Sequence, residues 1–208
     1  MITPTPEFWK VFKETNGALS CSESLFIIQA AALAPEGNYL ECGVAFGKSA
    51  MSAAYSLKNG MFALCDTHFE DEEIAENVVR KVEMFANKKN IIRYTSELST
   101  NRIQLIDNYS YVMLDTGDHD QVVIDEVNLI KNRMVKGGVI VMHDLDSQFL
   151  RVREGYDYLL STGNYEEIKP NWEEINNYVN ENNLEEGNIS WHHNELMNPN
   201  FVGALRRK

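Results

Sequence analysis

Short apolar segments and helical segments alternate along most of this chain. The apolar segments cover residues 39–44, 61–65, 90–94, 111–114 and 139–142, and apolar residues at helical spacing follow the first four at 49–55, 74–85, 102–106 and 122–134. Strands separated by helices pair in parallel, because each return to the same end of a sheet needs a crossover connection. The alternation therefore predicts an α/β fold in which helices cover both faces of a mostly parallel sheet.

The regions on either side of this pattern carry further elements. Helical spacing covers residues 5–15 and 22–34, and Ser20 with Glu23 has the spacing of a capping box at the start of the second helix. The Gly137-Gly138 pair is predicted to close the helix over 122–134 as a glycine C-cap.

After residue 146 the alternation weakens. We expect a helix at 148–160, a strand at 166–169, a polar helix from Trp172, and closing, antiparallel strands from the segments at 189–193 and 201–205. No linker rich in Pro, Gly or Ser separates this part from the front half, so a single domain is expected.

Charge and cysteine content restrict the setting and the partners. Nineteen Lys and Arg against 31 Asp and Glu give a net charge of −12, which disfavours nucleic acid and anionic membranes but suits a small ligand with a positive centre. The three cysteines are widely separated and fit neither a disulfide framework nor a zinc site. The start of the chain has no signal-peptide pattern and no apolar run could span a bilayer, so we expect a soluble, cytoplasmic protein.

Polar side chains gather where the predicted strands end. They lie at residues 41–47, 66, 96–97, 115–119 and 143–146. In open α/β sheets, ligands bind beyond the carboxyl ends of the strands, so this convergence predicts the functional site.

The first of these strand ends carries Glu41 and a turn with Gly43 and Gly47. Small residues let a ligand approach the backbone and the start of the next helix, although a tight βα turn explains them equally well. A carboxylate at this point repels a pyrophosphate but suits an amino group or another cationic centre, which argues against a dinucleotide. Asp66, at the end of the next strand, could bind ribose hydroxyls or simply cap a helix.

These residues carry a family resemblance. Residues 41–50 resemble the first motif of class I S-adenosylmethionine (SAM)-dependent methyltransferases, notably the small catechol-type O-methyltransferases. Residues 62–70, 117–119 and 136–144 are more similar to a neighbouring branch that includes macrolide sugar O-methyltransferases and proteins described as cephalosporin hydroxylases. The resemblance implies a Rossmann-like three-layer sandwich with a mostly parallel sheet and an antiparallel C-terminal strand pair.

The same resemblance implies roles for individual residues. Gly43 and Gly47 would line the methionine part of SAM and Ser49 would bind its carboxylate. Asp66 would bind the ribose. The full set of predicted cofactor-binding residues is Glu41, Gly43, Gly47, Ser49, Asp66, Ser96, Glu97 and Asp115, with Ser96 and Glu97 at the adenine edge.

A second group of acids could hold a metal. In the resembled enzymes, an aspartate from each of two strand ends binds a divalent cation such as Mg²⁺, which lowers the pKa of the acceptor hydroxyl. Asp115 and Asp144 are the matching positions, although the extra residue in Leu-Asp-Thr-Gly-Asp-His lets Thr116 take the place of Asp115. Asp146 or a water would be the third ligand. Helix capping and solvent exposure are the alternative role of these acids.

The predicted function is methyl transfer from SAM to a hydroxyl of a small molecule, with a sugar or a phenol as acceptor. His119 is the predicted general base, and Asp115 is the second predicted catalytic residue, through the metal that it would hold. The chain would divide into an N-terminal helical cap at 1–38, a cofactor-binding core at 39–146 and a C-terminal acceptor side at 147–208. A homodimer is one possible assembly. The alternatives are a metal-dependent oxygenase or hydrolase that uses the Asp/His cluster, including His143, and a non-catalytic SAM-binding module.

Overall fold

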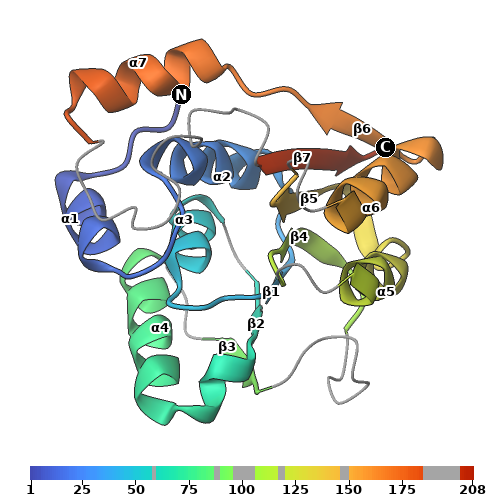
Figure 1. The fold of residues 1–208 in the computed structure, drawn as a ribbon, viewed down its shortest axis with the longest axis horizontal. Coiled ribbons are helices and arrows are strands. Elements are labelled where there is room, and N and C mark those ends of the chain that lie inside the picture. Colours follow the sequence, from blue (N-terminus) through green and yellow to red (C-terminus); the bar gives the residue numbers. More distant parts are fainter. Residues whose placement is uncertain (58–59, 87–89, 96–105, 117–119, 146–149, 185–201) are drawn as a thin grey trace.

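A seven-stranded sheet crosses the centre of the molecule in the computed structural model (Figure 1), with the strand order β3-β2-β1-β4-β5-β7-β6. Strands β1 to β5 pair in parallel, whereas β7 is antiparallel to both β5 and β6. The strands are β1 Asn38–Cys42, β2 Phe62–Cys65, β3 Ile91–Tyr94, β4 Tyr109–Leu114, β5 Met134–His143, β6 Tyr165–Ile168 and β7 Val202–Arg207. The mostly parallel sheet and its antiparallel C-terminal pair are confirmed.

The structure describes residues 1–57, 60–86, 90–95, 106–116, 120–145, 150–184 and 202–208. The segments predicted at 102–106 and 189–193 lie almost wholly outside these ranges. Within them, no helix combines the length and the apolar character needed to cross a membrane.

Helices cover both faces of the sheet and complete the predicted three layers. They are α1 Pro6–Glu14, α2 Cys21–Leu33, α3 Lys48–Ser56, the 3₁₀ helix η1 Thr67–Glu70, α4 Glu72–Phe85, α5 Asp120–Ile130, α6 Leu150–Ser161 and α7 Trp172–Glu181. In Figure 1, α1 to α4 and α7 lie on one side of the sheet, and α5 and α6 on the other. Buried side chains form a separate apolar core on each side.

Alternation along the strands divides the side chains between these two cores. On β1, Tyr39 points into the core beneath α2 and α3, whereas Leu40 and Cys42 point into the core beneath α5 and α6. Both sets are fully buried, as expected for a central parallel strand that has helices on both faces.

Local signals in the sequence explain where several helices begin. Thr5 caps α1 ahead of Pro6. The predicted capping box at the start of α2 is present. The Ser20 side chain accepts the backbone N–H of Glu23, and the Glu23 side chain accepts the backbone N–H of Ser20. Asp71 caps α4.

The prediction for Gly137-Gly138 is wrong. Helix α5 ends at Ile130, and the glycine pair lies inside β5. Tyr109 of β4 pairs with Met134 and Tyr111 pairs with Val139, so β5 has extra residues between these pairs and its register shifts there. Gly137 takes a φ of 78° in this bulge, a backbone conformation that glycine adopts without strain.

Candidate active site at the carboxyl ends of the strands

The polar residues predicted from the strand ends do converge on one edge of the sheet. Glu41, Asp66, Asp115 and His143 lie at or directly after the carboxyl ends of β1, β2, β4 and β5. These four strands are consecutive in the sheet, in the order β2-β1-β4-β5. The topology therefore brings side chains from a span of about half the chain to one place.

The turn after β1 is built from unusual backbone conformations. Gly43 and Gly47 have φ values of 82° and 87°, and Ala45 between them has a φ of 45°. Helix α3 begins directly after Gly47, which has no side chain to cap it. The first amide groups of α3 are thus available to an anionic group such as a carboxylate.

Glu41 lies under this turn and is fully buried. The Ser49 hydroxyl donates a hydrogen bond to Glu41 Oε1, while Glu41 Oε2 has no partner among the residues that the structure describes. Burial raises the pKa of Glu41 well above its usual value, and the neighbouring Asp115 and Asp66 raise it further. A cationic group nearby would lower the pKa of Glu41 and favour the ionised carboxylate.

Asp66 holds the turn and the next element together. Its Oδ2 accepts the backbone N–H of Ala45 at 2.6 Å, and its Oδ1 accepts the backbone N–H of His68 at 2.7 Å. Of the two roles predicted for Asp66, helix capping is therefore confirmed, because Asp66 caps η1. The Nδ1 atom of His68 also lies 2.8 Å from Oδ1, and this side chain is 60% exposed. A ligand could displace His68 without breaking the two backbone bonds.

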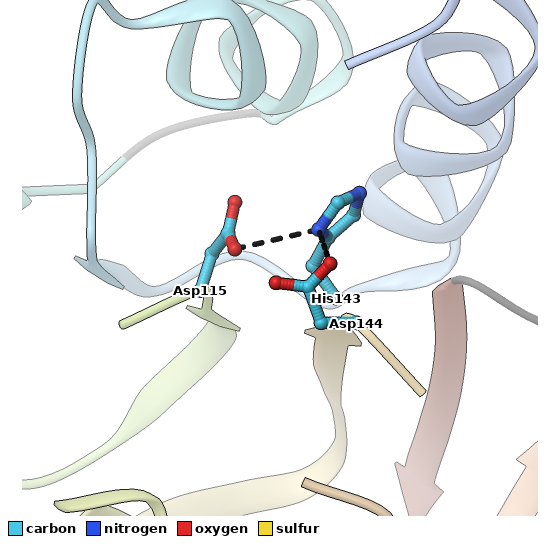
Figure 2. Close-up of side chains that lie close together, drawn as sticks. All are labelled: Asp115, His143 and Asp144. Carbon is cyan, nitrogen blue, oxygen red and sulfur yellow. Dashed lines mark ion pairs between the residues drawn. The ribbon is translucent and has the colours of Figure 1, made fainter. Parts of the chain in front are cut away.

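A histidine surrounded by carboxylates lies at the ends of β4 and β5. His143 Nδ1 is 3.0 Å from Asp144 Oδ1 and 3.4 Å from Asp115 Oδ1, and Figure 2 shows both carboxylates on the same side of the ring. His143 Nε2 lies 3.2 Å from Glu23 Oε1 on α2. Burial alone lowers the pKa of His143, but Asp115, Asp144 and Glu23 outweigh it and hold the pKa well above the usual value.

The geometry separates the two candidates for the position after β4. Asp115 faces His143, whereas the Thr116 hydroxyl donates to Glu126 Oε2 on α5 at 2.9 Å. Asp115 is therefore the residue of the pair that contributes to the cluster.

The donor set of this cluster is compatible with a divalent cation. One ligand atom each from Asp115, His143 and Asp144 can be chosen so that all lie within 4.8 Å of one another. A neutral His143 would offer Nδ1 while donating Nε2–H to Glu23, which is the usual outer-shell arrangement of a metal-bound histidine. A protonated His143 satisfies the two aspartates by itself, so the cluster does not require a metal.

Four predicted site residues lie outside the described ranges: Ser96, Glu97, His119 and Asp146. Two other residues of the site have a larger part in it than their sequence context indicates. From the sequence, His143 is assigned a role only in an alternative metal cluster, although its position at the end of β5 indicates the site. Glu23 was identified only as a helix cap, and no sequence pattern links it to a residue 120 positions later.

This strand order, with a glycine turn after β1 and acids after β1, β2 and β4, defines the class I methyltransferase fold. A family model described as "Methyltransferase domain" matches residues 40–145, and the chain belongs to that family of enzymes. The resemblance seen in the sequence is thereby confirmed. A search of curated proteins finds no significant match.

Solved structures share this fold at low sequence identity. The O-methyltransferase TomG from Streptomyces achromogenes, involved in tomaymycin synthesis and solved in complex with SAM, is 14% identical with a TM-score of 0.61, covering 81% of this chain and 84% of that chain. The O-methyltransferase from Bacillus cereus in complex with SAH is 14% identical with a TM-score of 0.59, covering 79% and 84%. An rRNA methylase from Streptococcus thermophilus is 12% identical with a TM-score of 0.59, covering 92% and 99%. At these identities the likeness concerns the fold, and it does not choose an acceptor.

Proposed function

We propose that the chain transfers a methyl group from SAM to a hydroxyl of a small molecule. The observation that carries this proposal is the convergence of Glu41, Asp66 and Asp115 beside an uncapped helix start. Asp66 and Asp115 are both near enough to Glu41 to raise its pKa. Such a site favours a ligand that carries positive charge and a carboxylate but no phosphate, which describes SAM and not a dinucleotide.

Each part of this site has a proposed task. The amides at the start of α3 would bind the carboxylate of the methionine part, joined by Ser49 when its hydroxyl turns away from Glu41 Oε1, and Glu41 would then face the amino group. Asp66 would bind the ribose hydroxyls in place of His68. Ser96 and Glu97 are proposed for the adenine edge on the strength of the sequence.

The chemistry assigned to the protein is modest. SAM supplies a methyl group that is already activated by its sulfonium. The protein must align the acceptor and take up its hydroxyl proton, tasks that positioning and general-base catalysis can perform. We assign the uptake of the proton to His119. Asp115 and Asp144, with Asp146 as third ligand, would hold a divalent cation that lowers the pKa of the hydroxyl.

The Asp115, His143 and Asp144 cluster also keeps one alternative open, a transition-metal oxygenase or hydrolase. One histidine and two carboxylates form a donor set that suits such metals. This alternative gives the glycine turn and Asp66 no task, so we rank it second.

The proposed function is tested by methyl transfer from isotopically labelled SAM to a panel of sugars, phenols and other hydroxylated molecules, with amines as the comparison acceptors. Reactions are run with Mg²⁺, with Mn²⁺ and with a chelator. Label on a hydroxyl oxygen of an acceptor supports the proposal, provided that the labelled product is lost in Asp115→Asn. Label on nitrogen acceptors only would contradict the O-methyl assignment, and metal-dependent turnover without SAM would favour the alternative.

A further inference from the structure

We propose that Glu23 is a positioning residue, whose carboxylate orients the His143 ring so that Nδ1 faces Asp115 and Asp144. This proposal rests on the proposed function, because it assigns a task to a residue that would serve the same site. It adds a member from α2, an element outside the part of the chain that the family model matches.

The two oxygens of Glu23 have separate partners. Oε2 accepts the backbone N–H of Ser20 at 2.8 Å, which is its bond in the capping box, and the Ser20 hydroxyl at 2.7 Å. Oε1 takes no part in these bonds and lies 3.2 Å from His143 Nε2. Helix capping therefore explains the contacts of Oε2 but not the contact between Oε1 and His143.

Burial makes the contact with His143 consequential. The Glu23 side chain is only 9% exposed and that of His143 only 12%. Burial acts against the ionised form, yet His143 and Ser20 hold the pKa of Glu23 below its usual value. A hydrogen bond between two buried side chains is stronger than one in water, and such a bond restricts rotation of the ring.

The orientation of the ring decides what the cluster can do. With Nε2 held by Glu23, Nδ1 lies between the carboxylates at the ends of β4 and β5 (Figure 2). Glu23, Asp115 and Asp144 are the charged groups that contact the ring in the described part of the chain. If the ring turned over, Asp115 and Asp144 would lose their shared donor and their mutual repulsion would spread them.

Two variants separate positioning from capping. Glu23→Gln preserves a capping box, since the amide oxygen of glutamine reaches back to the cap backbone as glutamate does, but it then presents its amide NH₂, a donor, to His143 Nε2 in place of an acceptor oxygen. Ser20→Ala removes the hydroxyl that accepts the Glu23 backbone N–H, keeps the Ser20 backbone bond to Oε2, and leaves the Glu23 and His143 pair intact.

The direct measurement is NMR of the full chain with ¹⁵N-labelled histidine, with the His143 signals assigned from His143→Asn. We expect a downfield, slowly exchanging Nε2 proton in the wild type, at least tenfold faster exchange in Glu23→Gln, and the wild-type signal in Ser20→Ala. In the methyl-transfer assay, kcat should fall about tenfold in Glu23→Gln at unchanged SAM affinity, as for partners that orient a functional histidine.

Other results would overturn the proposal. If the Nε2 proton is unchanged in Glu23→Gln, or if Ser20→Ala alters it as much, Glu23 serves only the helix. A protein that neither binds SAM nor transfers methyl groups would contradict the proposed function instead, because the NMR comparison needs no ligand and no turnover.

Discussion

Gly43 lies so close to Asp115 that no side chain fits between them, because a Cβ atom on Gly43 would lie 1.9 Å from the Asp115 carbonyl oxygen. The turn after β1 is thereby packed directly on the backbone that follows β4. Asp115 in turn donates its own N–H to the Cys42 carbonyl at 2.9 Å. The glycine turn and the acidic cluster are thus in direct backbone contact, and a change in either should alter the other.

Three glycine-to-alanine variants measure this packing. Gly163, with a φ of 72°, has open space around it, Gly47 would contact the methyl groups of Val78 at 3.1 Å and 3.3 Å, and Gly43 would collide with backbone. We expect Gly163→Ala to cost about 1 kcal/mol through its positive φ alone, Gly47→Ala slightly more, and Gly43→Ala at least about 3 kcal/mol. Chemical denaturation checks the order, and equal costs at all three positions would contradict it.

The stability of the protein should depend on pH through Glu41. Because the pKa of the buried carboxyl is well above its usual 4.5, the folded chain holds a proton that the unfolded chain releases. The free energy of unfolding must then fall as pH rises from about 4.5 through the raised pKa. Each pKa unit of that rise corresponds to about 1.4 kcal/mol.

Glu41→Gln removes this dependence while keeping an acceptor for Ser49. The variant should match the wild type near pH 4.5 and exceed it in stability by an amount that grows toward neutral pH. Denaturation at several pH values measures the difference. A constant difference, or one that shrinks with pH, would show that Glu41 is ionised in the folded protein. The same variant should bind SAM more weakly.

Much of the fold could be predicted from the sequence because apolar periodicity is a local property. The five parallel strands and the helices at both ends of the chain were found in this way. Met134 fits the helical spacing of 122–134 equally well, yet it begins β5, and the Gly137-Gly138 pair belongs to a bulge that only pairing with β4 defines. Glycine signals a special backbone conformation without saying which one it is.

The sequence predicts only those site residues that lie at the ends of strands. Asp66 illustrates this limit, because its capping role and its proposed ligand role use the same carboxylate and no pattern distinguishes them. The contact between Glu23 and His143 depends on how α2 packs against β5, which is a tertiary relationship without a local signal.

Two buried hydroxyls, those of Ser24 on α2 and Ser52 on α3, should differ in how much each contributes to stability. Ser52 donates to the Lys48 carbonyl at 2.7 Å, so Ser24, whose hydroxyl lies 2.7 Å from that of Ser52, must donate to it. Ser24→Ala leaves Ser52 bonded and should cost about 1 kcal/mol, whereas Ser52→Ala strands the Ser24 hydroxyl and should cost about 2 kcal/mol.

The double variant of Ser24 and Ser52 completes this cycle. It should be less destabilised than the sum of the single variants, because neither hydroxyl is then buried without its partner. Additive costs in denaturation experiments would mean that the two hydroxyls do not interact.

The two partners of the proposed ribose site should respond differently. Asp66→Asn weakens the acceptor for Ala45, His68 and the ribose alike, so SAM affinity should fall by about a hundredfold. His68→Ala removes only the exposed imidazole that a ribose would displace, and it should leave affinity within about threefold or improve it. Calorimetric titration with SAM compares the two, and a greater loss in His68→Ala would overturn the assignment.

Calorimetric titration of the unaltered protein with SAM and SAH tests whether the strand ends bind SAM. NAD serves as the comparison ligand, since it carries the same adenosine on a pyrophosphate. We expect saturable, one-to-one binding of SAM and SAH in the micromolar range or tighter and no detectable binding of NAD. Binding of NAD, or no binding of SAM and SAH with or without a divalent cation, would contradict it.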